Sequence, residues 1–315
     1  MMKRKTLLLL LLSTICIATT AVGQVTEPEA TLKVQSTDTI PGWKTGGVVG
    51  FNVAQSALIN WAAGGENSFA VNGIFSVFAN YKQGKTNWDN SLDVGYGLLN
   101  QGEGSDYKKT DDKIDLLSKF GREAYKNLYF AGLFNFKSQM TAGYNYRADG
   151  TKNRISDAFA PAYIIAAIGM DYKPSSYLSI FAAPATGKTT FVIDDELSNA
   201  GAFGVDPGEN SFSEFGGYMR FIFTKNDFES EFLKNVSITS KLDLFSNYLE
   251  NPQNIVVNWE NLIALRINKF LTVNINTHLI YDDKIKIAKE VDGVEESYPR
   301  VQFKEIFGLG ISFKF

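Results

Sequence analysis

Residues 302–315, the last of the chain, have the sequence QFKEIFGLGISFKF. Side chains alternate between the two faces of a β-strand, so an extended chain here places six apolar side chains on one face. They are Phe303, Phe307, Leu309, Ile311, Phe313 and Phe315. The segment therefore predicts a strand with one apolar face that ends on an aromatic residue.

The same alternation recurs along most of the sequence. Leu271, Val273 and Ile275 share one predicted face, and Thr272 and Asn274 share the other. A period of two with one apolar face is typical of half-buried strands. The predicted strands are 47–55, 69–81, 86–100, 112–124, 128–140, 158–172, 176–184, 212–225, 235–248, 255–267, 270–282 and 302–315.

Two features favour a membrane-spanning barrel over a soluble sandwich. Most predicted strands are long enough for a tilted span of a bilayer, which takes about 9–11 residues. The connections also alternate in length, since 101–111 and 141–157 are long whereas 82–85 and 125–127 are tight. We therefore predict an all-β fold, a transmembrane antiparallel β-barrel of about twelve strands over residues 47–315. The expected location is a bacterial outer membrane, with both termini in the periplasm.

The N-terminus has the pattern of an export signal. Basic residues 3–5 precede an apolar run from Leu7 to Ala18, and small residues lead to Gly23. We expect a signal peptide over 1–23 and a polar periplasmic linker over 24–46. Cleavage would remove Cys16, the only cysteine, and would change the net charge from −3 to −6. An acidic chain of this kind argues against nucleic acid as a partner.

Aromatic residues make up 13% of the chain, which suits the belts that barrels place at both membrane interfaces. The expected interface aromatics are Trp61, Trp88, Trp259 and Phe315. The apolar last strand with its terminal aromatic also resembles the signal read by the barrel-insertion machinery of outer membranes. The expected partners are therefore outer-membrane lipid and, through 302–315, that machinery.

Two motifs resemble one protein family. The first is NWAAGGENS over residues 60–68, and the second is NWDNSL over 87–92, followed by Tyr96-Gly97. The family is an uncharacterised group of outer-membrane β-barrel proteins, grouped as a domain of unknown function. The resemblance implies the fold and the location, and it brings no activity and no catalytic residues.

The predicted inward faces carry charges of both signs. A single sign would indicate an ion-selective pore, whereas mixed signs suit either a salt-bridge network across a narrow lumen or a weakly selective polar channel. The predicted polar network of the lumen comprises Asp89, Asp93, Asp115, Lys119, Arg220, Lys241, Asp243, Asn258, Glu260, Arg266 and His278. Glu123, Lys137 and Lys304 are further charges on the predicted inward faces.

Three other motifs are weaker. The stretch 184–189 resembles part of a phosphate-binding loop but is followed by apolar β-forming residues where a helix is needed. Acidic residues gather in the predicted loop 185–211, which we expect to be mobile, with little to bury. Trp61 with Gly64-Gly65 could form a ligand-contact loop, but the pattern favours a tight turn that places Trp61 at the membrane interface. We expect no metal site and no cofactor.

His278, the only histidine, could activate a serine in a membrane-embedded lipid hydrolase. Residue pairing favours a structural role instead. A turn over 267–269 would place Arg266 opposite Phe270, Glu260 opposite Asn276, and Asn258 opposite His278. Two functions stay open: a barrel without enzymatic activity, acting as a narrow polar channel or a loop-presenting binding protein, and a lipid hydrolase using His278.

Overall fold

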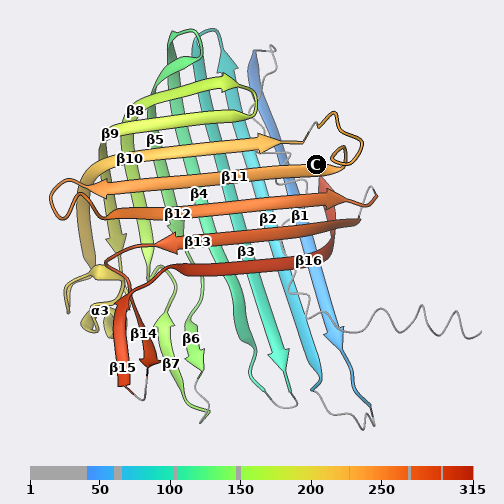
Figure 1. Cartoon of the computed structure of the whole chain (residues 1–315), viewed down its shortest axis with the longest axis vertical. Coiled ribbons are helices and arrows are strands. Elements are labelled where there is room, and N and C mark those ends of the chain that lie inside the picture. The colour runs from blue at the N-terminus through green and yellow to red at the C-terminus, as the bar shows by residue number, and fades with distance from the viewer. Residues whose placement is uncertain are drawn as a thin grey trace, which may run out of the picture.

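Twelve strands of the computed structural model close into one antiparallel barrel (Figure 1). The structure describes residues 41–59, 66–102, 105–146, 150–226, 228–268, 271–291 and 294–314. The barrel strands are β1 (Gly42–Ser56), β2 (Ser68–Gln83), β3 (Thr86–Gln101), β4 (Lys108–Tyr125), β5 (Leu128–Ser138), β8 (Ala162–Ser175), β9 (Leu178–Phe191), β10 (Ser211–Lys225), β11 (Val236–Asn247), β12 (Ile255–Arg266), β13 (Leu271–Tyr281) and β16 (Gln302–Lys314). The predicted twelve-stranded barrel is confirmed.

Each barrel strand pairs with the barrel strands before and after it in the chain, and the ring closes between β1 and β16. Closure runs from Val48 opposite Lys314 to Phe51 opposite Ile311. β1 begins and β16 ends at the same end of the barrel, which we call the terminal end. The opposite end is called the loop end.

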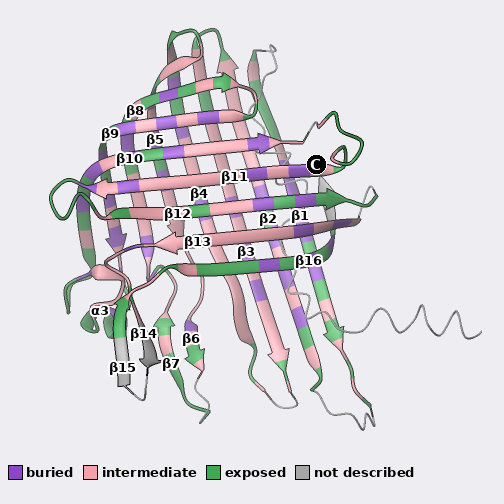
Figure 2. Cartoon of the chain, viewed as in Figure 1, coloured by how far each residue is buried: buried purple, intermediate pink, exposed green. Residues whose placement is uncertain are grey.

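The outer face of the barrel is apolar. Phe51 and Phe307 are 58% and 51% exposed, whereas their strand neighbours Asn52 and Ile306 lie buried. Figure 2 shows exposed and buried residues alternating along β1 and β16. A closed barrel leaves no strand edge unpaired, and an apolar outside lets it sit in hydrocarbon. This is the architecture of bacterial outer-membrane β-barrels. No helix in the described ranges is long and apolar enough to cross a membrane.

The connections differ strongly between the two ends. At the terminal end, β2–β3 and β4–β5 are joined by tight turns. At the loop end, the connections contain the hairpins β6 (Gly143–Tyr146)–β7 (Lys152–Ser156) and β14 (Lys286–Val291)–β15 (Val294–Pro299). The helix α3 (Asp195–Asn199) and the 3-10 turn η1 (Ala202–Gly204) lie at the same end (Figure 1).

Several expected strand boundaries were wrong. β1 begins at Gly42, inside the segment expected to be a linker, and β8 begins at Ala162 rather than 158. β9 continues to Phe191, because a bulge near Pro184 lets the strand resume its pairing with β8 and β10. Residues 184–189 are therefore part of a strand and cannot form a phosphate-binding loop.

The connection between β9 and β10 is packed, contrary to the expectation that it has little to bury. Val192, Leu197 and Val205 are at most 5% exposed and form a small core with Ala160. The helix α3 supports this core, because the side chain of Asp194 caps it by accepting a hydrogen bond from the backbone N–H of Leu197.

Candidate functional site in the barrel lumen

A charged cluster joins opposite walls of the lumen toward the loop end. Lys113 on β4 lies 3.2 Å from Glu260 on β12, and these two strands stand opposite each other in the ring. Lys137 on β5 lies 3.5 Å from Glu260, 3.6 Å from Asp243 and 3.9 Å from Asp115. Two lysines and three carboxylates thus bridge the interior, and we call them the loop-side charge cluster.

Arg220 anchors this cluster to the wall. Its Nε and Nη2 donate to the two carboxylate oxygens of Asp243, at 2.5 Å and 2.8 Å. Tyr218 donates its hydroxyl to the same carboxylate at 2.8 Å. Arg220 is 4% exposed, so this two-fold hydrogen bond is shielded from solvent. Bidentate arginine–carboxylate pairs are strong and fix the geometry of both side chains.

A second charged cluster lies toward the terminal end. Lys119 is 2.6 Å from Asp171, and Ser179 donates a hydrogen bond to the same carboxylate. Lys173 lies 3.0 Å from Asp89 and 3.6 Å from Asp171. The sequence prediction omitted both Asp171 and Lys173. Asp171 follows the period-two inward positions of the predicted strand 158–172, whereas Lys173 falls in the segment expected to be a turn, which the structure shows as part of β8. Every ionic group of this cluster has an opposite charge beside it.

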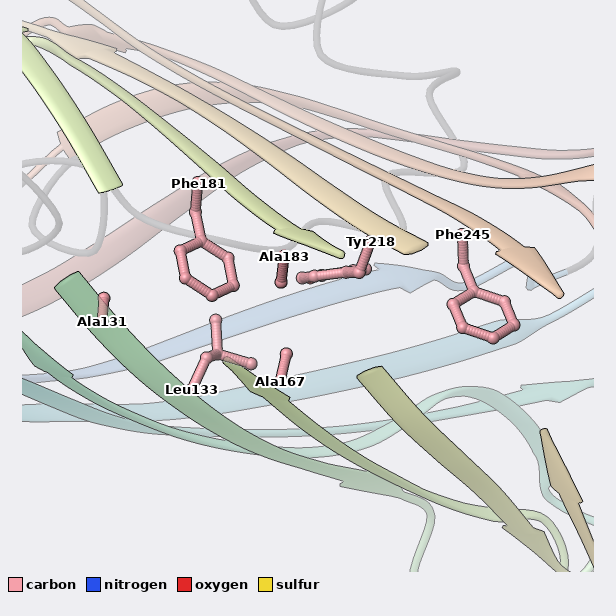
Figure 3. Packing of buried hydrophobic residues seen from close by; sticks show 7 residues of the cluster. All are labelled: Ala131, Leu133, Ala167, Phe181, Ala183, Tyr218 and Phe245. Atoms are coloured by element: carbon pink, nitrogen blue, oxygen red, sulfur yellow. The ribbon is translucent and has the colours of Figure 1, made fainter. Parts of the chain in front are cut away.

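Apolar side chains on β5, β8, β9, β10 and β11 pack together inside the barrel. Figure 3 shows Phe181, Ala183 and Tyr218 facing Leu133 and Ala167 across the interior. We call this group the apolar plug. Its buried residues are Ala131, Leu133, Ala167, Phe181, Ala183, Tyr218 and Phe245.

A second apolar contact supplements the plug on another side. Ile74 on β2 and Leu262 on β12 are buried together across the intervening strands. Lys241 also reaches across to within 3.9 Å of Asp93, which accepts a hydrogen bond from Ser76. Side chains from several walls therefore meet in the middle of the barrel.

His278 faces the lumen, but its predicted strand register was wrong. His278 pairs with Glu260, Asn258 pairs with Ile280, and Arg266 pairs with Thr272. The turn is longer than expected, which shifts the ladder by two residues and leaves each side chain on its expected face. The contact with Asn258 persists diagonally, since His278 Nε2 lies 2.8 Å from Asn258 Oδ1.

The other expected site residues divide by position. Asp89, Asp93, Asp115, Lys119, Lys241 and Asp243 lie in the interior contacts described above. Arg266 is exposed at the terminal end of β12 and lies outside these clusters. Trp61 and Phe315 lie outside the described residues.

Trp88 and Trp259 both lie on the outer face, and each donates its indole N–H to a serine of the neighbouring strand. The acceptors are Ser118 at 2.9 Å and Ser240 at 3.0 Å. Trp88 also packs against Trp43 near the terminal end. These rings are amphipathic, with an apolar body toward lipid and a bonded N–H.

The acidic residues of the β9–β10 connection serve a local purpose. Arg154 on β7 lies 3.2 Å from Asp194 and 2.6 Å from Glu196, which ties the β6–β7 hairpin to α3. The hydrogen bond to Glu196 raises the pKa of Arg154. Among the described residues, no group of three or more His, Cys, Asp or Glu side chains is arranged to hold a metal ion.

A cavity of about 470 Å³ lies above the loop-side charge cluster. Its floor includes Lys113, Glu260 and His278, and its walls include Tyr163 and Val256. Ile155, Phe203 and Ile285 line it from the loop-end connections. A small pocket of about 40 Å³ shares the floor residues Lys113, Glu260 and His278. The small pocket is also lined by Ile74, Asp93 and Asn276.

Residues 53–144 match the model of a family described as a protein of unknown function (DUF3078). The resemblance to an uncharacterised family is thereby confirmed for this part of the chain. No curated protein matches the sequence.

Several solved structures are similar to the chain over most of their length. The COG4313 outer membrane channel from Pseudomonas putida F1 has a TM-score of 0.40 and 10% identity, covering 90% of this chain and 98% of that chain. The translocator domain of the autotransporter NalP from Neisseria meningitidis has a TM-score of 0.37 and 11% identity, covering 91% and 92%. OmpT, an outer membrane protein of Vibrio cholerae, has a TM-score of 0.30 and 8% identity, covering 87% and 97%.

Proposed function

We propose that this protein is an outer-membrane barrel that is closed at mid-height by its own side chains and binds a molecule from the loop end. The contact between Lys113 and Glu260 carries the proposal, because it joins two strands on opposite sides of the ring. The apolar plug beneath it, with Phe181 at 0% exposed, supports the same conclusion. A lumen crossed by paired charges and packed apolar groups has little room for a solute.

The proposed orientation has the loop end outside the cell and both termini in the periplasm. Long connections on one end and tight turns on the other support it, because outer-membrane barrels expose their long loops. The proposed partners are membrane lipid and, through strand 302–315, the barrel-insertion machinery.

The two alternatives meet different obstacles. A narrow polar channel would have to pass the contact of Ile74 with Leu262 and the plug around Phe181. A lipid hydrolase would need His278 to face lipid and a nucleophilic hydroxyl. His278 instead lines the lumen cavity, and its Nε2 bonds to Asn258. Both observations favour a binding barrel.

Single-channel recording in a planar bilayer tests the proposal. We expect the refolded wild type to insert without open steps. A variant with Phe181→Ala and Leu262→Ala removes two of the side chains that close the middle, so small open steps should occur. Phe215→Ala with Ile263→Ala is the matched control, because Phe215 and Ile263 are exposed on the outer face. Regular open steps in the wild type would contradict a closed barrel.

A further inference from the structure

The loop-end cavity has the size of a site for a small molecule. Its volume of about 470 Å³ lies within the range of about 300–1,000 Å³ that is typical of ligand pockets. It is bounded below by the charged cluster and above by Phe203 and Ile285 from the loop-end connections. A molecule held there would therefore contact both the barrel wall and the loops.

One side of the cavity is apolar. Ile165, Phe245, Val256 and Ile280 face it from β8, β11, β12 and β13. Ile165 and Val256 also pack against the apolar plug, so this wall continues the plug upward. Such a surface favours an aliphatic or aromatic body over a sugar or a nucleotide, because burial of apolar area supplies the affinity.

The charged side of the cavity carries six carboxylates and four lysines, and the two most exposed of these side chains are those of Lys113 and Lys304. The side chain of Lys113 is 35% exposed and that of its partner Glu260 is 19% exposed. The side chain of Lys304 is 46% exposed, whereas that of Asp111, 3.2 Å away, is 12% exposed. A ligand that enters from the loop end thus meets ammonium side chains in front of more deeply placed carboxylates.

We infer that the cavity binds a small organic anion, with its apolar body against the Val256 wall and its carboxylate beside Lys113 and Lys304. The inference rests on the proposed function, since it names the class of molecule that the closed barrel holds. The carboxylate of the ligand would accept charge-assisted hydrogen bonds from the ammonium groups of Lys113 and Lys304, beside their protein partners Glu260 and Asp111. Such bonds are stronger where water is partly excluded.

Calorimetry on the folded protein in amphipol tests this assignment with octanoate, octylammonium and octanol as probes. They share one apolar chain and differ in charge. We expect saturable one-site binding of octanoate and much weaker binding of the other two. Lys113→Gln with Lys304→Gln should weaken octanoate by about tenfold or more, and Lys126→Gln, in the turn between β4 and β5, is the control.

A cavity-filling pair of variants completes the test. Val256→Trp should abolish octanoate binding, whereas Val257→Trp, one residue along on the outer face, should leave it unchanged. If Val256→Trp fails to fold, the lysine variants decide alone. Equal or tighter binding of octylammonium, or an equal effect of the two tryptophan variants, would overturn the assignment. A protein that is silent in a bilayer yet binds no probe contradicts this inference alone, and open steps contradict the proposed function.

Discussion

At the scale of single residues, the interior holds its charges by pairing them. Arg220 is buried and pairs with Asp243 of the loop-side charge cluster, and the hydroxyl of Tyr218 donates a third hydrogen bond to the same carboxylate. Removing one partner of a buried pair leaves the other charge without compensation, which costs more than the pair contributes. Pairs near the loop end, such as Lys304 with Asp111, keep contact with water.

This contrast leads to a prediction about stability. Asp243→Ala should lower the free energy of unfolding by about 3–5 kcal/mol, because Arg220 stays buried without its carboxylate. Asp111→Ala should cost less than about 1 kcal/mol, because Lys304 can turn to solvent. Urea unfolding in lipid vesicles, followed by tryptophan fluorescence, measures both. Similar losses in the free energy of unfolding for the two variants would contradict the prediction that the burial of Arg220 makes its pair with Asp243 more important for stability.

Residue patterns in the sequence predict which face a side chain takes, and they predict its partner poorly. Glu260 and His278 were assigned to the lumen from alternation alone, but their direct pairing depended on the length of one turn. A register shift of two residues leaves each side chain on the same face of the sheet, so the alternation of the sequence cannot reveal such a shift. The partner of Lys113 was equally hidden, because Glu260 lies far away in the sequence.

At the scale of strands, the outer face contains polar residues that bond to one another. Ser240 donates to Asn261, which in turn donates to Thr277, and Trp259 donates to Ser240. This chain crosses β11, β12 and β13. A polar group without a hydrogen-bond partner in lipid costs roughly several kcal/mol of stability. Because these residues bond to one another, they can face hydrocarbon.

A similar arrangement occurs between β3 and β4. Trp88 donates to Ser118, and Ser118 donates to Asn90. Trp88-Asp89-Asn90 and Trp259-Glu260-Asn261 thus share a pattern in which the tryptophan and asparagine face outward and the acid faces the lumen. The sequence indicated the tryptophans as interface anchors, but not their bonded serines.

The connection between β9 and β10 shows why loop composition misled the prediction. Its Gly, Asp and Asn content suggested a loose segment, but three spaced apolar residues give it a core. We therefore expect the intact loop to resist protease added to whole cells. Leu197→Asp should make it readily cleavable, since Leu197 is 5% exposed, whereas Asn199→Asp on the exposed side should not. Gel analysis of the fragments measures both, and equal cleavage of wild type and Leu197→Asp would contradict a packed loop.

At the scale of the whole molecule, the barrel was predictable and its plug was not. Twelve alternating segments with uneven connections determine a closed sheet, because each strand pairs with its neighbours in the chain. The plug depends on contacts between distant strands, such as β2 with β12. These contacts follow from the tilt and stagger of the strands, which the period of two does not record.

The register of the closing strands offers a test of the complete ring. Phe51 on β1 lies opposite Ile311 on β16, and both point outward with more than half of their surface exposed. Opposed Cβ atoms in a ladder lie about 4.5–5.5 Å apart, whereas diagonal neighbours lie about 7–8 Å apart.

Phe51→Cys with Ile311→Cys should therefore form a disulfide under mild oxidation of the folded barrel, because small adjustments bring the Cβ atoms within bonding range. Val53→Cys with Ile311→Cys, two residues out of register, is the matched control and should cross-link much less. Protein beginning at Gln24 lacks Cys16, so no natural thiol competes. The cross-link ties the two ends of the sheet into a ring, and a non-reducing gel after heating should show a compact band. Faster cross-linking of the Val53 pair would place β1 against β16 in another register and alter the stagger on which the interior contacts depend.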